Sequence, residues 1–151
     1  MADPLVKVLL DTSIYIPFIN QGIYHPALEI SEGIPLLYMS AVVVEELYAG
    51  AFDPYTVRLL DKIYNTFDRL GRLVTPLSSD WQKTGKIVAK IGKKYGFEEI
   101  FLSRLVNDVL IALSARRIGA ITYTKNLKDF QRVKEYLEFK LGCFVSLNFI
   151  L

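Results

Sequence analysis

The sequence has very little cysteine and histidine: one Cys, Cys143, and one His, His25, among 151 residues. A single cysteine excludes an internal disulfide and is expected of a protein in a reducing compartment. One His and one Cys do not make the clusters that are typical of zinc sites. We therefore expect Cys143 to be a small residue of an apolar strand, and His25 to lie in a loop without a catalytic role.

Long hydrophobic runs are also absent. The longest, residues 34–44 and 141–151, are well short of the roughly 20 apolar residues that a membrane-spanning helix needs. The first residues, MADPLVKVLL, place Asp3 before a very short apolar stretch and lack the pattern of a cleavable signal. These features predict a cytoplasmic protein with no membrane contact.

Neither sign of charge is in large excess, because 18 Lys and Arg face 16 Asp and Glu for a net charge of +2. Composition alone therefore does not indicate nucleic-acid binding. Basic residues do recur at helical spacing, which predicts a basic stripe at Lys83, Lys86, Lys90, Lys93 and Lys94. A solvated helix face explains such a stripe at least as well as a phosphate-binding surface does.

Apolar residues are plentiful, at 52% against roughly 45–50% in average globular proteins. The length fits one domain, residues 1–151, with a sizeable core. The surplus of apolar residues suggests that another chain covers part of the surface.

Short apolar runs alternate with helical patterns along the chain. Strands are expected at 5–10, 35–40, 72–78, 120–124 and 143–151. Helices are expected at 14–20, 24–31, 41–50 after Ser40, 54–70, 81–95 after Ser79 or Asp80, 105–118, and 126–139 with Asn126 as the cap. This alternation predicts an α/β fold, a three-layer α/β/α sandwich around a mainly parallel sheet.

Ligands of open parallel sheets bind beyond the carboxyl ends of the strands, so polar residues there are the candidates for a site. They are Asp11, Glu45, Glu46, Asp108, Thr124, Asn126 and Asp129. Each also has an ordinary explanation. Asp11 and Asn126 suit helix caps, Asp108 and Asp129 suit the first turns of helices, and both glutamates suit exposed positions.

Four segments together carry more information than any one of these residues. In order, "LLDTS", "SAVVVEELYAG", "NDVLIALSA" and "TYTKNLKDF" resemble the motifs of PIN-domain ribonucleases, and are most similar to VapC-type toxins of toxin–antitoxin systems. The resemblance covers nearly the whole chain. It implies that the catalytic and metal-binding acids are Asp11, Glu46, Asp108 and Asp129, with Glu46 favoured over Glu45 by its spacing to Gly50.

The resemblance implies a hydrolase that cleaves RNA phosphodiester bonds. Four converging carboxylates repel one another unless a cation lies among them, and oxygen ligands suit Mg²⁺ or Mn²⁺. Neighbouring polar side chains are then expected to orient the acids or the scissile phosphate, namely Thr12, Ser13, Thr124 and Asn126. Whether one or two metal ions bind stays open.

Three functions are compatible with this pattern. The first is the toxin of a type II toxin–antitoxin pair, which forms a homodimer and is inhibited by a cognate antitoxin. The second is a PIN nuclease of RNA processing or decay without a toxin role. The third is a catalytically inactive module that binds RNA or protein, and the presence of all four acids counts against it.

Aromatic residues indicate where partners would bind. The segments "IYIPFIN" and "YAGAFDPYTVRLLDKIYNTF" contain Tyr48, Phe52, Tyr55, Tyr64 and Phe67, and aromatic residues often anchor interfaces. Ordinary core packing is the competing explanation. We expect the antitoxin to lie along a groove between the early helices and to bring an Arg or Lys to the acids.

Overall fold

The computed structural model describes residues 3–22, 26–142 and 146–149. Five parallel strands form the central sheet: β1 (Leu5–Leu10), β3 (Ile34–Ser40), β4 (Leu73–Val74), β5 (Ile121–Tyr123) and β6 (Leu141–Gly142). Their order is β4-β3-β1-β5-β6. β1 is at the centre, and its residues Val8, Leu9 and Leu10 are completely buried, as expected for a strand covered on both faces.

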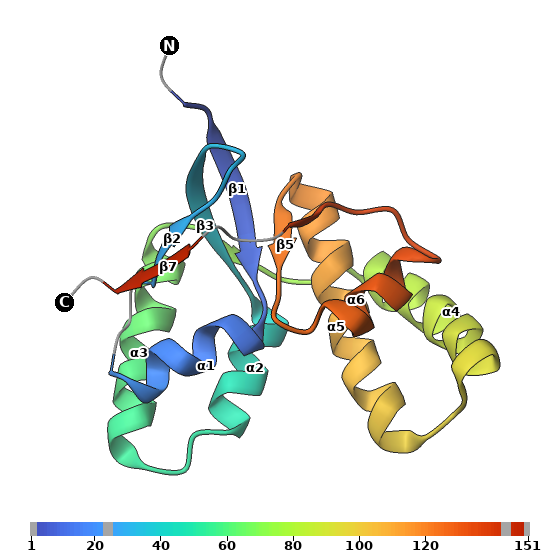
Figure 1. Cartoon of the computed structure of the whole chain (residues 1–151). Coiled ribbons are helices and arrows are strands. Elements are labelled where there is room, and N and C mark those ends of the chain that lie inside the picture. Colours follow the sequence, from blue (N-terminus) through green and yellow to red (C-terminus); the bar gives the residue numbers. More distant parts are fainter. Residues whose placement is uncertain (1–2, 23–25, 143–145, 150–151) are drawn as a thin grey trace.

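Within the described residues, six helices pack around this sheet. They are α1 (Thr12–Asn20), α2 (Ala41–Ala49), α3 (Pro54–Arg69), α4 (Ser78–Tyr95), α5 (Glu99–Ile118) and α6 (Leu127–Lys134). Figure 1 shows α1, α2 and α3 gathered in one group and α4, α5 and α6 in another, with the central strands between them. The expected α/β architecture with a parallel central sheet is confirmed.

Local sequence signals fix several helix ends. Ser40 caps α2 as predicted, since its hydroxyl accepts a hydrogen bond from the Val42 backbone N–H at 3.1 Å. α3 begins at Pro54, and Asp53 caps it by accepting from the Thr56 N–H at 2.8 Å. α5 ends at Gly119, which has the left-handed conformation that glycine adopts without strain.

The ends of other elements differ from the prediction. α5 begins at Glu99 and not at Leu105. The prediction missed its first residues because no apolar stripe marks them. The expected strand at 72–78 contains only Leu73–Val74, since Pro76 has no N–H for a ladder and α4 begins at Ser78. Neither Ser79 nor Asp80 is the cap of α4, whose N-cap position is Leu77.

The C-terminal third contains two further differences. α6 ends at Lys134 and not near residue 139; the chain beyond buries Leu137 and Phe139 on its way to β6, a strand that the sequence did not predict. The helix expected over 24–31 is wrong. Pro26–Glu29 is strand β2, which pairs antiparallel with β7 (Ser146–Phe149) in a separate two-stranded sheet. His25 and Cys143 lie outside the described residues.

The predicted basic stripe lies on α4. All five lysines are exposed, and Lys94 forms an ion pair of 2.8 Å with Glu135, beyond the end of α6. In the described part of the chain, no helix is both long enough and apolar enough to cross a membrane.

Candidate active site

A cavity of about 170 Å³ lies beyond the carboxyl ends of β1 and β5. Its walls come from the start of α1, the middle of α2 and α5, and the loop before α6. The residues that line it are Asp11, Thr12, Ser13, Ile16, Glu46, Arg104, Asp108, Ile111 and Asn126. Three of the four predicted acids therefore line one cavity, which we call the acidic pocket, and the fourth, Asp129, is joined to it through Asn126.

Asp11 stands where β1 ends and α1 begins, and only 5% of its surface is exposed. Its Oδ1 accepts a hydrogen bond from the Ser13 hydroxyl at 2.6 Å, and its Oδ2 accepts one from the Thr124 hydroxyl at 2.7 Å. Asp11 occupies the N-cap position of α1, although its carboxylate makes no side-chain capping hydrogen bond there. Burial raises the pKa of Asp11, while the two hydroxyls and the amides at the start of α1 oppose that rise.

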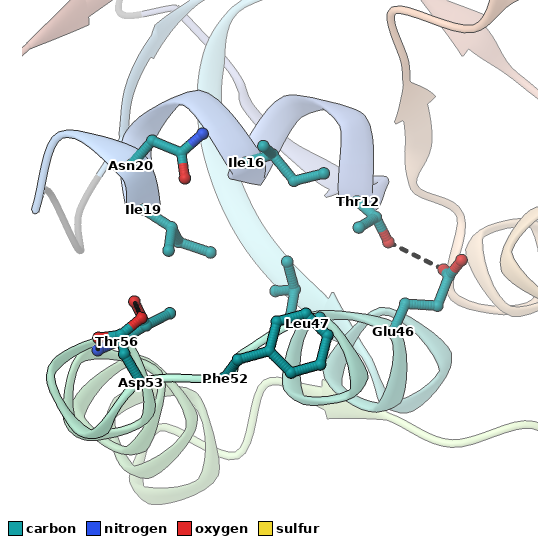
Figure 2. Close-up of a pocket in the computed structure, with 10 residues that line it drawn as sticks. Thr12, Ile16, Ile19, Asn20, Glu46, Leu47, Phe52, Asp53 and Thr56 are labelled. Carbon is teal, nitrogen blue, oxygen red and sulfur yellow. Dashed lines mark hydrogen bonds between the residues drawn. The ribbon is translucent and has the colours of Figure 1, made fainter.

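Glu46 projects from α2 toward α1. Figure 2 shows Thr12 reaching it from α1, and the Thr12 hydroxyl donates to Glu46 Oε1 at 2.8 Å. Burial raises the pKa of Glu46, and hydrogen bonds from Thr12 and from the Asn107 side chain lower it. Glu45 is exposed and belongs to a different cavity on the other side of α2. The two glutamates therefore line different cavities, a difference that their adjacent sequence positions do not indicate.

Asp108 is in the middle of α5, not in a first turn. Its Oδ2 atom is buried and has no hydrogen-bond partner. Burial is the largest cause of a pKa raised to about 8, and the negative charges of Asp11, Asp129 and Glu46 add to it. An unpartnered carboxylate oxygen among three other acids is costly, and this cost is what a bound cation would remove.

Asp129 lies in the first turn of α6, as its ordinary explanation predicted, and is 7% exposed. Its Oδ2 accepts from the Asn126 side-chain amide at 2.8 Å. Asn126 occupies the N-cap position but does not cap the helix with its side chain. Its backbone N–H donates instead to Thr124 Oγ1 at 2.8 Å, so a chain of hydrogen bonds links Asp11, Thr124, Asn126 and Asp129.

Arg104 is a residue of the pocket that the sequence did not reveal. It lies one helical turn before Asp108 on α5, and its side chain is 63% exposed. Its Nη2 atom is 4.0 Å from Asp129 Oδ2, and its charge opposes the pKa rise of Asp108. The spacing of four residues was the available signal, but the helix was expected to begin only at Leu105.

These residues fit a divalent cation with hard oxygen ligands. Within the described residues, no three Asp, Glu, His or Cys side chains already form a metal-binding cluster. Mg²⁺ does not require one, since it keeps several waters and takes only one or two carboxylates directly. The buried, unpartnered Oδ2 of Asp108 is the atom that most needs such a ligand.

A family model matches most of the chain. The family model described as PIN domain matches residues 8–136. No curated protein is a match.

Solved structures share the fold. VapBC-1 from nontypeable Haemophilus influenzae is 24% identical, with 91% of this chain and 97% of that chain covered and a TM-score of 0.56. DNA-bound VapBC from Salmonella typhimurium is 21% identical, with 85% and 92% covered and a TM-score of 0.55. VapBC2 from Rickettsia felis, bound to a promoter DNA fragment, is 19% identical, with 84% and 92% covered and a TM-score of 0.55. The PIN-like fold expected from the sequence is thereby confirmed.

Proposed function

The chain belongs to the PIN domain family, and from that premise we propose that it is a Mg²⁺- or Mn²⁺-dependent endoribonuclease, the toxin of a type II toxin–antitoxin pair. PIN domains are nucleases, so hydrolysis of a phosphodiester is the reaction class. The observation that carries the proposal is the buried Oδ2 of Asp108, which has no hydrogen-bond partner and lies in the field of three further acids that raise the Asp108 pKa.

Each polar neighbour has a defined task in this proposal. Asp11 and Asp108 bind the metal directly, and Glu46 and Asp129 complete its surroundings directly or through water. When bound, the cation supplies charge neutralisation and activation of water for attack on phosphorus. Hydroxyl groups hold two acids in place: Thr12 holds Glu46, while Ser13 and Thr124 hold Asp11. The Asn126 amide holds Asp129 in the same way.

Arg104 supplies the opposite charge at the rim of the acidic pocket. Its guanidinium is largely exposed and has several donors beyond the one near Asp129. Arginine binds phosphate oxygens through paired hydrogen bonds, so Arg104 is suited to hold the RNA backbone beside the acids. Loops and single strands are the natural RNA substrates, since their bases are accessible.

A groove next to the acidic pocket supports the proposed antitoxin. This cavity of about 280 Å³ lies between α1 and the α2–α3 region, and Figure 2 shows Ile16 and Asn20 on one side with Leu47 and Phe52 on the other. It shares Thr12, Ile16 and Glu46 with the acidic pocket. Phe52 is 92% exposed, as an interface anchor would be in the free chain. A peptide in this groove has direct access to the acids, where an Arg or Lys competes with the metal.

Exposed aromatic residues also support the proposed homodimer. Tyr55 and Tyr64 of α3 are exposed, whereas Phe67 of the same helix is buried in the protein core. The aromatic segment is therefore partly core and partly surface.

The direct test is cleavage of a panel of structured RNAs by the purified chain with Mn²⁺ and with EDTA. We expect cuts in loops and single strands with Mn²⁺, none with EDTA, and none by the variant Asp108→Asn. Cleavage that persists in EDTA would contradict the metal-dependent mechanism. Binding of RNA without any cleavage would favour the inactive module.

The toxin role requires a test in cells. Expression of the chain should arrest growth, and Asp108→Asn should relieve the arrest. Co-expression of a small protein encoded by the adjacent open reading frame should relieve it too. Cleavage in vitro without growth arrest would favour a nuclease of RNA processing or decay.

A further inference from the structure

A separate cavity of about 330 Å³ opens around Trp81 at the same edge of the sheet as the acidic pocket. We call it the Trp81 cavity; Val42, Glu45, Pro76, Trp81, Asn107 and Leu110 line it. It lies where β3 and β4 end, while the acidic pocket lies where β1 and β5 end. None of the groups described for metal binding lines it.

Two pairs of adjacent residues connect the cavities. Glu45 lines the Trp81 cavity and Glu46 lines the acidic pocket; Asn107 and Asp108 are divided in the same way. The Asn107 side chain favours the charged form of Glu46, so Asn107 and Glu46 lie close together at the boundary between the two cavities. A base beside a phosphate held at the acids would be placed at this boundary.

Trp81 provides a flat aromatic surface on a rigid support. It is the single tryptophan of the chain and is 56% exposed. The loop before it is held by Arg117, whose Nη2 donates to the Thr75 carbonyl at 2.7 Å. The first turn of α4 is held by Asp80, which accepts from the Leu77 N–H at 2.9 Å. The indole is thus presented without a need to order a loop first.

The residues that line the cavity suit a base better than a phosphate, and the nearby Arg117 guanidinium is already engaged by Thr75 and Asp80. Among the described residues that line it, Glu45 supplies a negative charge and no lysine or arginine is present. A carboxylate repels a phosphate but accepts hydrogen bonds from the amino groups of cytosine, adenine or guanine. Asn107 adds amide groups that also pair with base edges. Aromatic stacking contributes about 1–3 kcal/mol per base.

We propose that the Trp81 cavity binds a nucleobase next to the scissile phosphate, by stacking on Trp81 and by hydrogen bonds from its amino group to Glu45. This subsite rests on the proposed ribonuclease function and adds to it a preference for certain bases next to the cleaved bond. Cytosine, adenine and guanine are favoured at this position, and uracil, which has no amino group, is disfavoured.

Cleavage kinetics on short oligoribonucleotides that vary one base beside the cleaved bond test the proposal. Trp81→Ala should raise KM by about 5- to 150-fold, the equivalent of one lost stacking contact, with little change in kcat. Trp81→Phe should restore most of the loss. Phe97→Ala is the matched control, because Phe97 is a similarly exposed aromatic residue just beyond the other end of α4. Glu45→Gln should reduce the discrimination against uracil.

Fluorescence gives a second readout on the unmodified protein. Since Trp81 is the single tryptophan, saturating quenching by an uncleaved oligonucleotide in Mg²⁺-free buffer with Ca²⁺ reports stacking directly. An oligonucleotide that lacks the base at this position should quench much less. Equal quenching by both would overturn the subsite.

The possible failures are distinct. If the wild-type protein cleaves RNA and Trp81→Ala cleaves it equally well, the subsite is wrong and the proposed function stands. If the wild-type protein neither binds nor cleaves RNA, the proposed function fails and the subsite fails with it. If Trp81→Ala changes a dimer into a monomer by light scattering, Trp81 belongs to an interface between copies, and the subsite is again refuted.

Discussion

Two aspartates on neighbouring helices, Asp80 of α4 and Asp108 of α5, have opposite surroundings. Asp80 is buried, but its carboxylate accepts from the Leu77 N–H at 2.9 Å and lies 3.4 Å from the Arg117 guanidinium. Asp108 has a buried oxygen without a partner, and three acids raise its pKa further. Asp80 and the Oδ2 atom of Asp108 are both buried, and they differ in their partners. Those partners distinguish a structural carboxylate from one suited to a cation.

The largest expected effect comes from removing each of these two carboxylates in turn. Asp108→Asn should abolish RNA cleavage, while the thermal stability of the metal-free protein should hold or rise because a repulsive charge is removed. Asp80→Ala should retain metal-dependent cleavage but lower the free energy of unfolding by about 1–3 kcal/mol, since it leaves the Leu77 N–H without its acceptor and removes the ion pair with Arg117. Cleavage assays and urea unfolding check both. A marked loss of stability in Asp108→Asn would instead make Asp108 a structural acid.

A smaller effect is expected from the hydroxyl that holds Asp11. Thr124→Val keeps the buried shape but removes the hydrogen bond to Asp11 Oδ2. We expect the Mn²⁺ concentration for half-maximal activity to rise by about 10- to 100-fold, the usual effect of losing such a supporting group. Thr124→Ser retains the hydroxyl and serves as the control. Equal Mn²⁺ dependence in Val and Ser variants would show that Thr124 does not orient a ligand.

Arg104 near the acidic pocket and Arg117 beside Asp80 are expected to differ in the same way as the two aspartates. Arg104→Gln should raise KM for RNA by about fivefold with little change in stability, as expected of an exposed charge worth about 1 kcal/mol. Arg117→Gln should instead lower the thermal stability clearly, because Arg117 braces the Thr75 carbonyl and Asp80. Steady-state kinetics and thermal unfolding of both variants are the measurements. A lower kcat with unchanged KM in Arg104→Gln would argue against a binding role.

A separate effect is expected on the pH dependence of stability without metal. The folded pKa of Asp108, about 8, is above its unfolded value of 3.8, so the folded state holds the proton more tightly between these values. The free energy of unfolding in EDTA should therefore fall as pH rises through this window. Asp108→Asn should flatten that fall. An unchanged slope in the variant would mean that other groups cause it.

Three of the four predicted acids lie together in the structure, whereas the predicted bounds of the elements that carry them differ more. Asp11 was assigned correctly to the end of β1, because the apolar run that precedes it is short and continuous. Asp108 was expected in a first turn, whereas it is in the middle of α5. The part of α5 that was missed, residues 99–104, contains no buried residue, so no core-facing stripe marks the beginning of the helix.

Other features depend on contacts that no local pattern encodes. Strand β2 pairs with β7, more than a hundred residues away, and its segment was taken for a helix. Glu45 and Glu46 are adjacent in sequence, and only the packing of α2 between α1 and α5 assigns them to different cavities. Arg104 is on the same helix as Asp108 because α5 begins at Glu99, and this places Arg104 in the pocket.

The most direct test of the central claim, that the acidic pocket binds a divalent cation, is calorimetric titration of Mn²⁺ into the metal-free protein at pH 8. We predict saturable binding to the wild-type protein and to Asp80→Asn, with proton release as Asp108 ionises, and loss of that binding in Asp108→Asn. Binding of the same affinity in Asp108→Asn and in the wild-type protein would contradict the account.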